Sequence, residues 1–484
     1  MEIPVKTKMK IPANTADSWR FSVFAVLVSL AVLAWHAHER TPFGMDWQTV
    51  GFIAALVVLV RPFSPIAFMA LGVSETLAIL IALPWTNNNR LLHLFVFATI
   101  VLTGLYVFVR SGFRKMDAGE WMYQFQPLLR LVLVIVYGLS AWQKLNWDFF
   151  NPQYSCAVLE AGRIPLLPVA GSAIRWVLIG GTIGTEISLP LLLSVRRTRN
   201  FAVCFGVLFH VALAYTFYSF SVTMIALLFL FAPDGFIDAA IEFWRVHKGS
   251  ITATVTASGF IILAVLAYLS VAKIGQLLTQ IRQAPNVLDI LRNLWRETGY
   301  RVCFGLTALF ALPAGFLFWL SWHRPAAVQP SAHCYRPIPA PFWILPALLL
   351  FDGANPYLGL KTETSFAMYS NLRTEGGTTN HLIWRQPLSL ASYQEDLVQI
   401  LDSNDASLRA EAQPDLLVTF FTLRQSISKL ADQGVRNISI SYARRGKTIR
   451  VEKAESDPDL STRPPWIERK FLIFREIRRE GCFH

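Results

Sequence analysis

The sequence predicts an all-α polytopic membrane helix bundle of nine to eleven spans, followed by a small soluble α+β region at the C-terminal end. Of the 484 residues, 54% are hydrophobic and 16% are charged, whereas soluble domains carry about 25% charged residues. Phenylalanine occurs 35 times and tryptophan 15 times. The low charge and the aromatic content indicate that lipid surrounds roughly the first three quarters of the chain.

The apolar segments suit helical crossings, because a helix needs about 20 mostly apolar residues to pass through the hydrocarbon. They lack the alternation of β-barrel strands, and a backbone in lipid must satisfy its own hydrogen bonds, so we expect helices. Several segments are short, which leaves the range of nine to eleven spans. The candidate spans are residues 20–37, 47–61, 64–84, 91–110, 127–143, 173–194, 200–217, 219–232, 252–272, 302–322 and 338–352.

The basic residues between the apolar segments predict an integral membrane protein with a cytoplasmic N-terminus. The formal net charge is +12, and the 18 basic and 16 acidic residues from Asn355 onward nearly cancel. The excess lies among the membrane segments, as the positive-inside rule requires, so membrane lipid is an expected partner and nucleic acid is not. The basic clusters that share the cytoplasmic side are Lys6, Lys8 and Lys10; Arg110, Arg114 and Lys115; Arg196, Arg197 and Arg199; and Arg245 and Lys248.

The chain divides into four predicted regions. They are a cytoplasmic tail (1–19), a transmembrane domain (20–353), an ordered loop at the mouth of the bundle (354–389) and a soluble α+β tail (390–484). Within the last region, an amphipathic pattern predicts a helix at 413–432, and alternation predicts strands at 436–442 and 447–453. Residues 273–301 combine five basic residues with an apolar stripe, which indicates either a helix along the membrane interface or a miscounted span nearby.

The five cysteines favour neither a disulfide framework nor a metal site. They are odd in number and include no Cys-x-x-Cys pair, so even a single disulfide is not expected. The sequence also contains no HExxH, phosphate-loop or GxSxG motif. It therefore gives no support to metal or nucleotide chemistry.

Four ionisable residues lie within or at the end of predicted spans, where charge is costly and tends to be functional. Glu75 and Glu186 are either functional carboxyl groups or buried hydrogen-bonding partners of neighbouring helices. His210 is either a proton donor or a packing residue. Lys144 closes the fifth candidate span, where a lysine can also extend to the interface. Taken singly, none of these residues identifies a function.

Four stretches of the chain carry motifs that occur together in one family. Residues 138–150 read GLSAWQKLNWDFF, and residues 85–94 read WTNNNRLLHL. Residues 185–234 combine an acidic residue, a basic turn, a Phe-His pair and a closing Pro-Asp, and residues 355–377 follow the last spans. In order and spacing these stretches resemble the vitamin K-dependent γ-glutamyl carboxylases and their bacterial relatives, the horizontally transferred transmembrane domain family. The resemblance implies a bacterial inner-membrane protein.

The resemblance also implies a chemistry. In the carboxylases a lysine deprotonates a reduced quinone, which reacts with oxygen to give a strong base, and carbon dioxide captures the resulting glutamate carbanion. By motif position the implied base is Lys144, with His210 and Glu186 available for proton transfer. The implied substrate- or cofactor-binding residues are Trp142, Trp147, Asn88, Asn89, His93, Met368 and Asn371.

The cost of burying charge gives a second reason to expect one site. Lys144, Glu186 and His210 lie on or beside different apolar segments, and burying them separately would cost several kcal/mol. Sharing one polar cavity offsets much of that cost. We therefore expect these three residues to converge on a cavity lined by Trp142 and Trp147.

Two positions depart from the carboxylase pattern. The chain has Asn89 where the carboxylases have histidine after two asparagines, and Asn146 replaces an aspartate. These departures put glutamate carboxylation in doubt, so the substrate and cofactors stay open. Two other classes also remain: a non-enzymatic transporter or binder of a small amphiphile, and a membrane assembly protein whose tail binds a peptide or protein partner.

Overall fold

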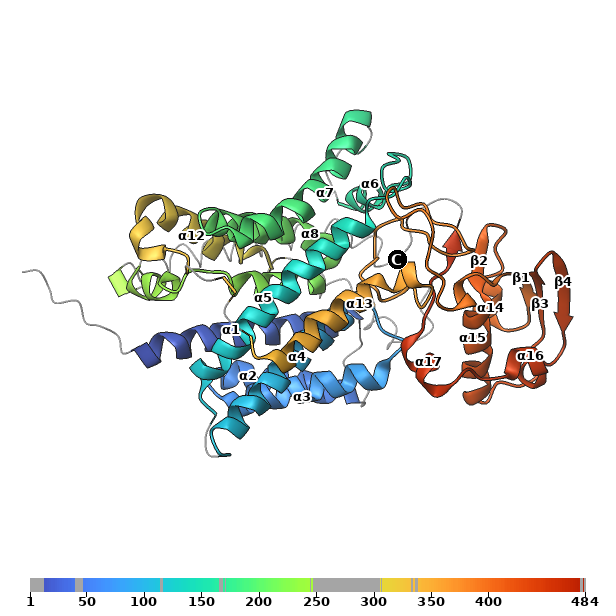
Figure 1. Cartoon of the computed structure of the whole chain (residues 1–484), viewed down its shortest axis with the longest axis horizontal. Helices are drawn as coiled ribbons and strands as arrows, with labels where there is room; N and C mark the ends of the chain where they lie inside the picture. Colours follow the sequence, from blue (N-terminus) through green and yellow to red (C-terminus); the bar gives the residue numbers. More distant parts are fainter. Residues whose placement is uncertain are drawn as a thin grey trace, which may run out of the picture. The chain divides into compact units, whose positions relative to one another are not determined.

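The computed structural model is mainly helical, and six of its described helices are long and apolar enough to cross a membrane. This agrees with the predicted membrane-helix class. The six are α1 (Ala13–Glu39), α3 (Pro65–Ala82), α4 (Asn88–Arg110), α5 (Ala118–Gln143), α7 (Ser172–Ser194) and α8 (Arg199–Phe229) (Figure 1). The structure describes residues 13–39, 47–113, 116–164, 169, 171–243, 245–246, 305, 307–331, 334–335, 338–478 and 482.

The predicted count of nine to eleven spans is not reached among these residues. The candidates 200–217 and 219–232 both lie in α8, where two helical segments meet at a kink. The kink is at Phe217 (φ −130°, ψ 49°), next to the predicted break between the two candidates. The candidate span 252–272 and the interfacial stripe within 273–301 lie outside the described residues.

Three further apolar helices are shorter than a full crossing. They are α2 (Trp47–Val60), α12 (Ala311–His323) and α13 (Ile344–Leu358), with 14, 13 and 15 residues. A helix of 15 residues extends for about 22 Å, which is less than the hydrocarbon thickness of about 30 Å. By length, these three helices are therefore too short to be candidate membrane spans.

Contacts divide the chain into two compact units. Unit 1 comprises Met1–Ala78, Val96–Leu133 and Leu191–Ala340, and unit 2 comprises Ile79–Phe95, Val134–Pro190 and Pro341–His484. In unit 1, Arg130 of α5 donates from Nε (2.8 Å) and Nη2 (2.5 Å) to the Leu230 carbonyl, at the end of α8, and Gln126 donates to the same carbonyl at 2.9 Å. The last carbonyls of a helix have no partner within the helix, so these donors satisfy the end of α8.

Glu75 is a buried structural residue of unit 1. Its side chain is fully buried in α3, and one carboxylate oxygen lies 4.0 Å from Nε2 of His36 on α1. The carboxylate occupies the space that a side chain at Gly51 of α2 would need. The contacts of Glu75 therefore fit its interpretation as a buried partner of neighbouring helices.

The C-terminal part of unit 2 contains a five-stranded antiparallel sheet in the order β4-β3-β1-β2-β5. Helix α15 lies beside this sheet (Figure 1), and its Leu423 and Ile427 share a buried core with Ile400 and Tyr442. The strands are β1 (Leu397–Ser403), β2 (Leu416–Thr419), β3 (Ile440–Arg444), β4 (Lys447–Val451) and β5 (Ile477–Arg478). The helices are α14 (Ala406–Ala410), α15 (Phe420–Asp432), α16 (Pro458–Ser461) and α17 (Trp466–Phe471).

The helix predicted at 413–432 is wrong at its start. It begins at Phe420, because the four residues before it form β2 and pair with β1 and β5. Thr419 caps the helix, since its Oγ1 accepts a hydrogen bond from the Thr422 N–H at 3.1 Å. A threonine at the N-cap is favourable for this reason. The amphipathic pattern predicted the helix correctly from Phe420 onward. The predicted start was too early because β2 continues the same apolar run.

A disulfide joins Cys156, the first residue of α6 (Cys156–Ala161), to Cys482 near the end of the chain. The expectation that no bridge forms is therefore wrong. The two cysteines are 326 residues apart in sequence, and only the folding of unit 2 brings their Cα atoms to 4.8 Å. Among the described residues, Cys204 and Cys334 are free and buried.

Candidate functional site

The central feature of the candidate site is a buried ion pair between Lys144 and Glu186. Lys144 follows the last residue of α5, and Glu186 lies on α7. The Lys144 Nζ atom is 3.0 Å from Oε1 of Glu186 and donates to Oγ of Ser140 at 2.7 Å. Ser140 in turn donates to the same Glu186 oxygen at 3.0 Å. The structure thus brings two of the three predicted catalytic residues together.

The pair is almost completely shielded from solvent. The Lys144 and Glu186 side chains are 6% and 11% exposed. Removing one partner from a buried ion pair costs about 3–5 kcal/mol, because the remaining charge is left uncompensated. Oε2 of Glu186 is also buried and accepts no hydrogen bond within the described part of the chain. A buried carboxylate oxygen without a donor is unusual, since buried polar groups are generally paired.

The residues on either side of Lys144 hold a second stretch of chain, residues 362–371, beside the end of α5. Gln143 donates from Nε2 to the carbonyls of Ser365 (2.8 Å) and Gly353 (2.9 Å). Asn146 donates from Nδ2 to the carbonyl of Ser370 at 2.6 Å. Because Lys144 lies between these two anchors, its position is coupled to the 362–371 segment.

The 362–371 segment has a strained backbone. Thr364, Phe366, Tyr369 and Asn371 all have positive φ angles, between 48° and 60°. Residues other than glycine rarely adopt this conformation, and each instance costs of order 1–3 kcal/mol unless the surroundings enforce it. Such strain concentrates at functional sites. The hydrogen bonds from Gln143 and Asn146 are among the contacts that enforce it here.

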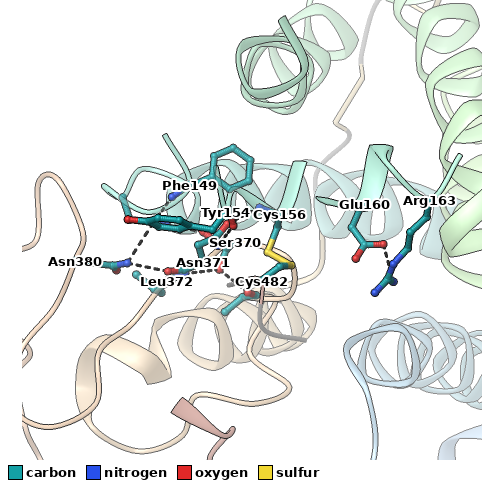
Figure 2. Close-up of a disulfide and its surroundings, with 12 residues drawn as sticks. Phe149, Tyr154, Cys156, Glu160, Arg163, Ser370, Asn371, Leu372, Asn380 and Cys482 are labelled. Atoms are coloured by element: carbon teal, nitrogen blue, oxygen red, sulfur yellow. Dashed lines mark hydrogen bonds and ion pairs between the residues drawn. A yellow bond between two sulfur atoms is a disulfide. The ribbon is translucent and has the colours of Figure 1, made fainter. Parts of the chain in front are cut away.

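Two more predicted binding residues, Asn88 and Asn371, fix the same segment. Asn88, the first residue of α4, accepts a hydrogen bond from the Phe366 N–H on Oδ1 at 2.6 Å. Asn371 accepts from the Cys156 N–H at 2.8 Å and donates to the Tyr154 carbonyl at 3.0 Å. Figure 2 shows Asn371 beside the disulfide, where it connects the segment to the chain before α6. Both asparagine side chains therefore form hydrogen bonds with backbone groups of the protein.

The predicted aromatic residues have different environments. The Trp142 ring packs on His381 with centroids 4.8 Å apart, and its carbonyl accepts from Nε2 of His381 at 2.9 Å. Nδ1 of His381 accepts from the Trp384 N–H at 2.9 Å, so the imidazole is neutral and carries its proton on Nε2. Burial lowers the pKa of His381, which keeps it neutral. Trp147 is 67% exposed.

The remaining predicted residues are divided between the two units. Asn89 and His93 are buried on α4, and Met368 is half-buried in the 362–371 segment, all in unit 2. His210 is buried on α8 in contact with the rings of Phe209 and Phe220, in unit 1. The convergence of His210 on Lys144 and Glu186 therefore stays a prediction.

Four residues of the site escaped sequence reasoning. Ser140 lies one helical turn before Lys144, a spacing that could have identified it as a neighbour. Gln143 and His381 form hydrogen bonds with distant backbone groups, and no local pattern indicates such contacts.

The fourth residue is Glu363 of the 362–371 segment. Burial raises the pKa of its carboxyl group to about 7, although the nearby Arg475 lowers it. Within the described residues no group of three histidine, cysteine or acidic side chains could hold a metal ion.

Asn146→Asp should destabilise the protein by about 2–4 kcal/mol, because a carboxylate cannot donate to the two carbonyls that Nδ2 now contacts, those of Gln143 and Ser370. The measurement is thermal unfolding in detergent. Asn151→Asp is the matched control, since the Asn151 side chain accepts from the Gln153 N–H and an aspartate retains that acceptor. Equal stability of the two variants would show that the donors of Asn146 are not needed.

The chain has no significant match to a protein-family model, to a curated protein or to a solved structure. The resemblance to the carboxylases and the horizontally transferred transmembrane domain family thus rests on the sequence motifs alone, and the function implied by it is a proposal.

Proposed function

We propose that this chain is a membrane enzyme that removes a proton from a hydroxyl-bearing amphiphile, such as a quinol or a lipid, with Lys144 as the base. The observation that carries the proposal is the buried Lys144–Glu186 pair with its unsatisfied Oε2 atom. That oxygen can accept a hydrogen bond from a hydroxyl group of the ligand. The motif resemblance around Lys144 points independently to the same residue.

The pair can supply a neutral amine without an external base. Transfer of a proton from the Lys144 ammonium to the Glu186 carboxylate, across 3.0 Å, leaves an uncharged amine and an uncharged carboxylic acid. Two neutral groups suit a low-dielectric site better than two charges without solvent. The amine then takes the proton of the ligand hydroxyl, so the ligand becomes an anion and Lys144 becomes an ammonium again.

Ser140 is suited to hold the pair during this transfer. Its hydroxyl accepts from Lys144 and donates to Glu186 in the same arrangement. A reduced quinone, when bound, would supply an acidic hydroxyl and the electrons for a reaction with oxygen. The 362–371 segment supports the site because its anchors bracket Lys144, and rigid support is what precise proton transfer requires.

Lys144→Ala and Lys144→Arg should both lower turnover by about 10²–10⁴-fold, the usual contribution of a general base. Arginine keeps the positive charge but cannot become a neutral base near pH 7. The measurement is oxygen uptake by the full-length protein in detergent, with a reduced naphthoquinone as the probe. Lys361→Ala is the control, since Lys361 forms an equally buried ion pair with Asp352 (2.5 Å) in the same unit.

Turnover that persists in folded Lys144→Arg would contradict the proposed base. Saturable binding of the reduced naphthoquinone with no turnover in the wild type would instead favour the non-enzymatic binder or transporter.

We further infer that the loop containing Cys156 and the C-terminal end lie on the non-cytoplasmic side of the inner membrane. Stable disulfides form in oxidising compartments, and the Cys156–Cys482 bridge joins these two parts of the chain. The basic clusters support the same orientation, because the positive-inside rule predicts a cytoplasmic N-terminus and a cytoplasmic turn at Arg196–Arg199.

Single-cysteine labelling tests this orientation. Gln153→Cys should react with a membrane-impermeant maleimide in intact cells, whereas Arg197→Cys should react only after permeabilisation. Both positions are solvent-exposed. Labelling of positions 153 and 197 from the same side would refute the arrangement.

A cavity in the C-terminal tail favours a second candidate function, the binding of an acidic peptide. It measures about 520 Å³ and is lined by Arg424, Arg444, Arg445, Asp396 and seven other residues. Arg444 and Arg445 share the carboxylate of Asp396, at 2.5 Å and 3.0 Å, and Asp459 is the other acidic residue of the lining, so three arginines face two carboxylates. Nε of Arg424 is buried and has no acceptor among the described residues. This surplus of guanidinium groups suits a carboxylate from a partner.

Arg424→Gln should weaken the binding of a glutamate-rich peptide to the full-length protein about tenfold, since one charge-assisted hydrogen bond is lost. Fluorescence anisotropy of a labelled peptide would measure the affinity. Arg450→Gln removes an equal charge from β4, where Arg450 forms an exposed pair with Glu452, and should leave the affinity unchanged. An equal loss in both variants would indicate long-range attraction instead of a site.

A further inference from the structure

A second cavity of about 520 Å³ lies in unit 1, where the turn between α7 and α8 meets the end of α12. Its lining includes two arginines, three aromatic side chains and three polar side chains. None of these residues belongs to the Lys144 site. The lining consists of Arg196, Arg197, Asn200, Phe201, Phe318, Ser321, Trp322, Pro325, Val328, Gln329 and Pro330.

The two arginines leave positive charge available in this cavity. Arg196 donates from Nε to the Pro330 carbonyl at 3.0 Å and from Nη2 to Oε1 of Gln329 at 3.4 Å. Both partners are neutral, so they do not cancel the charge. Arg197 is exposed, and neither arginine forms an ion pair within the described part of the chain. An anion is therefore the complementary ligand.

Asn200 adds a hydrogen-bond acceptor to the cavity. Its Nδ2 donates to the Val328 carbonyl at 2.9 Å and to Oγ of Ser321 at 3.0 Å. Ser321 gives its own proton to the Leu317 carbonyl, so it can only accept from Asn200. These bonds fix the orientation of the amide. Oδ1 of Asn200 is then buried without a donor among the described residues, which suits a ligand that carries a hydroxyl group.

The rim of the cavity suits a lipid. Phe201, Phe318 and Trp322 are 53%, 51% and 77% exposed, and they lie near the ends of apolar helices. Aromatic rings at span ends mark the membrane interface, where a headgroup and the first acyl carbons lie. Arginines between such helix ends recognise anionic headgroups.

We propose that this cavity binds the headgroup of an anionic, hydroxyl-bearing glycerophospholipid such as phosphatidylglycerol. The phosphate lies against Arg196 and Arg197, a headgroup hydroxyl donates to Oδ1 of Asn200, and the acyl chains leave past Phe201 and Phe318. A phosphate without a headgroup hydroxyl leaves Asn200 unsatisfied. A phosphatidylcholine headgroup has no hydroxyl and places a cation near the arginines.

Native mass spectrometry of the full-length protein, titrated with phosphatidylglycerol in detergent, tests the site. Arg196→Gln/Arg197→Gln should weaken phosphatidylglycerol binding about tenfold or more, because two charge-assisted contacts are lost. Arg61→Gln/Arg110→Gln is the matched control, since both arginines are exposed in unit 1 and flank apolar helices. This control should bind as the wild type does. Equal loss in both double variants, or no loss in either, overturns the proposal.

A second variant tests the hydroxyl contact separately. Wild-type protein should prefer phosphatidylglycerol to phosphatidic acid, which lacks the headgroup glycerol, and Asn200→Ala should remove most of that preference. The ratio of the two lipids is insensitive to a general loss of fold. Soluble glycerol phosphate carries the same phosphate and hydroxyl groups without acyl chains. If it binds with the same affinity as phosphatidylglycerol, the site is not a lipid site. An unchanged preference in Asn200→Ala would also contradict the proposal.

Discussion

Hydrogen bonds donated from the end of α5 hold the candidate site together. Gln143 contacts the carbonyls of Gly353 and Ser365, and Asn146 contacts the carbonyl of Ser370. They tie α5, a helix long and apolar enough to cross a membrane, to a segment more than 200 residues later whose backbone is strained. Without these donors, buried carbonyls would lose their partners and positive φ angles would have less to enforce them. The position of Lys144 depends on the hydrogen bonds of both Gln143 and Asn146, because it lies between them in the chain.

The sequence predicted the chemical part of this site better than its architecture. Lys144 and Glu186 stood out because ionisable residues in apolar segments are costly, and the structure pairs them at 3.0 Å. The role of Asn146 could not be predicted, since it depends on carbonyls that only the folded chain presents. In the structure Asn146 donates where an aspartate could only accept, which gives this departure from the carboxylase pattern a physical reason.

Long-range contacts also explain the two largest errors. The disulfide joins cysteines at a separation for which cysteine spacing carries no signal. In the tail, the apolar run before α15 satisfies helical and extended patterns alike, and pairing with β1 and β5 decides in favour of a strand. Local periodicity predicted the strands β3 and β4 more closely, because a hairpin is specified by neighbouring residues.

The buried ion pair between Lys144, directly after α5, and Glu186 of α7 bears on function. Replacing a buried pair with apolar residues of similar size is often neutral or stabilising, so stability alone does not require Lys144 and Glu186. Buried polar groups generally have hydrogen-bond partners. Glu186 keeps one buried oxygen without a donor among the described residues, and so does Asp352 in its pair with Lys361. The proposal that a ligand completes the Lys144 pair therefore depends on this open oxygen together with the sequence motif around Lys144.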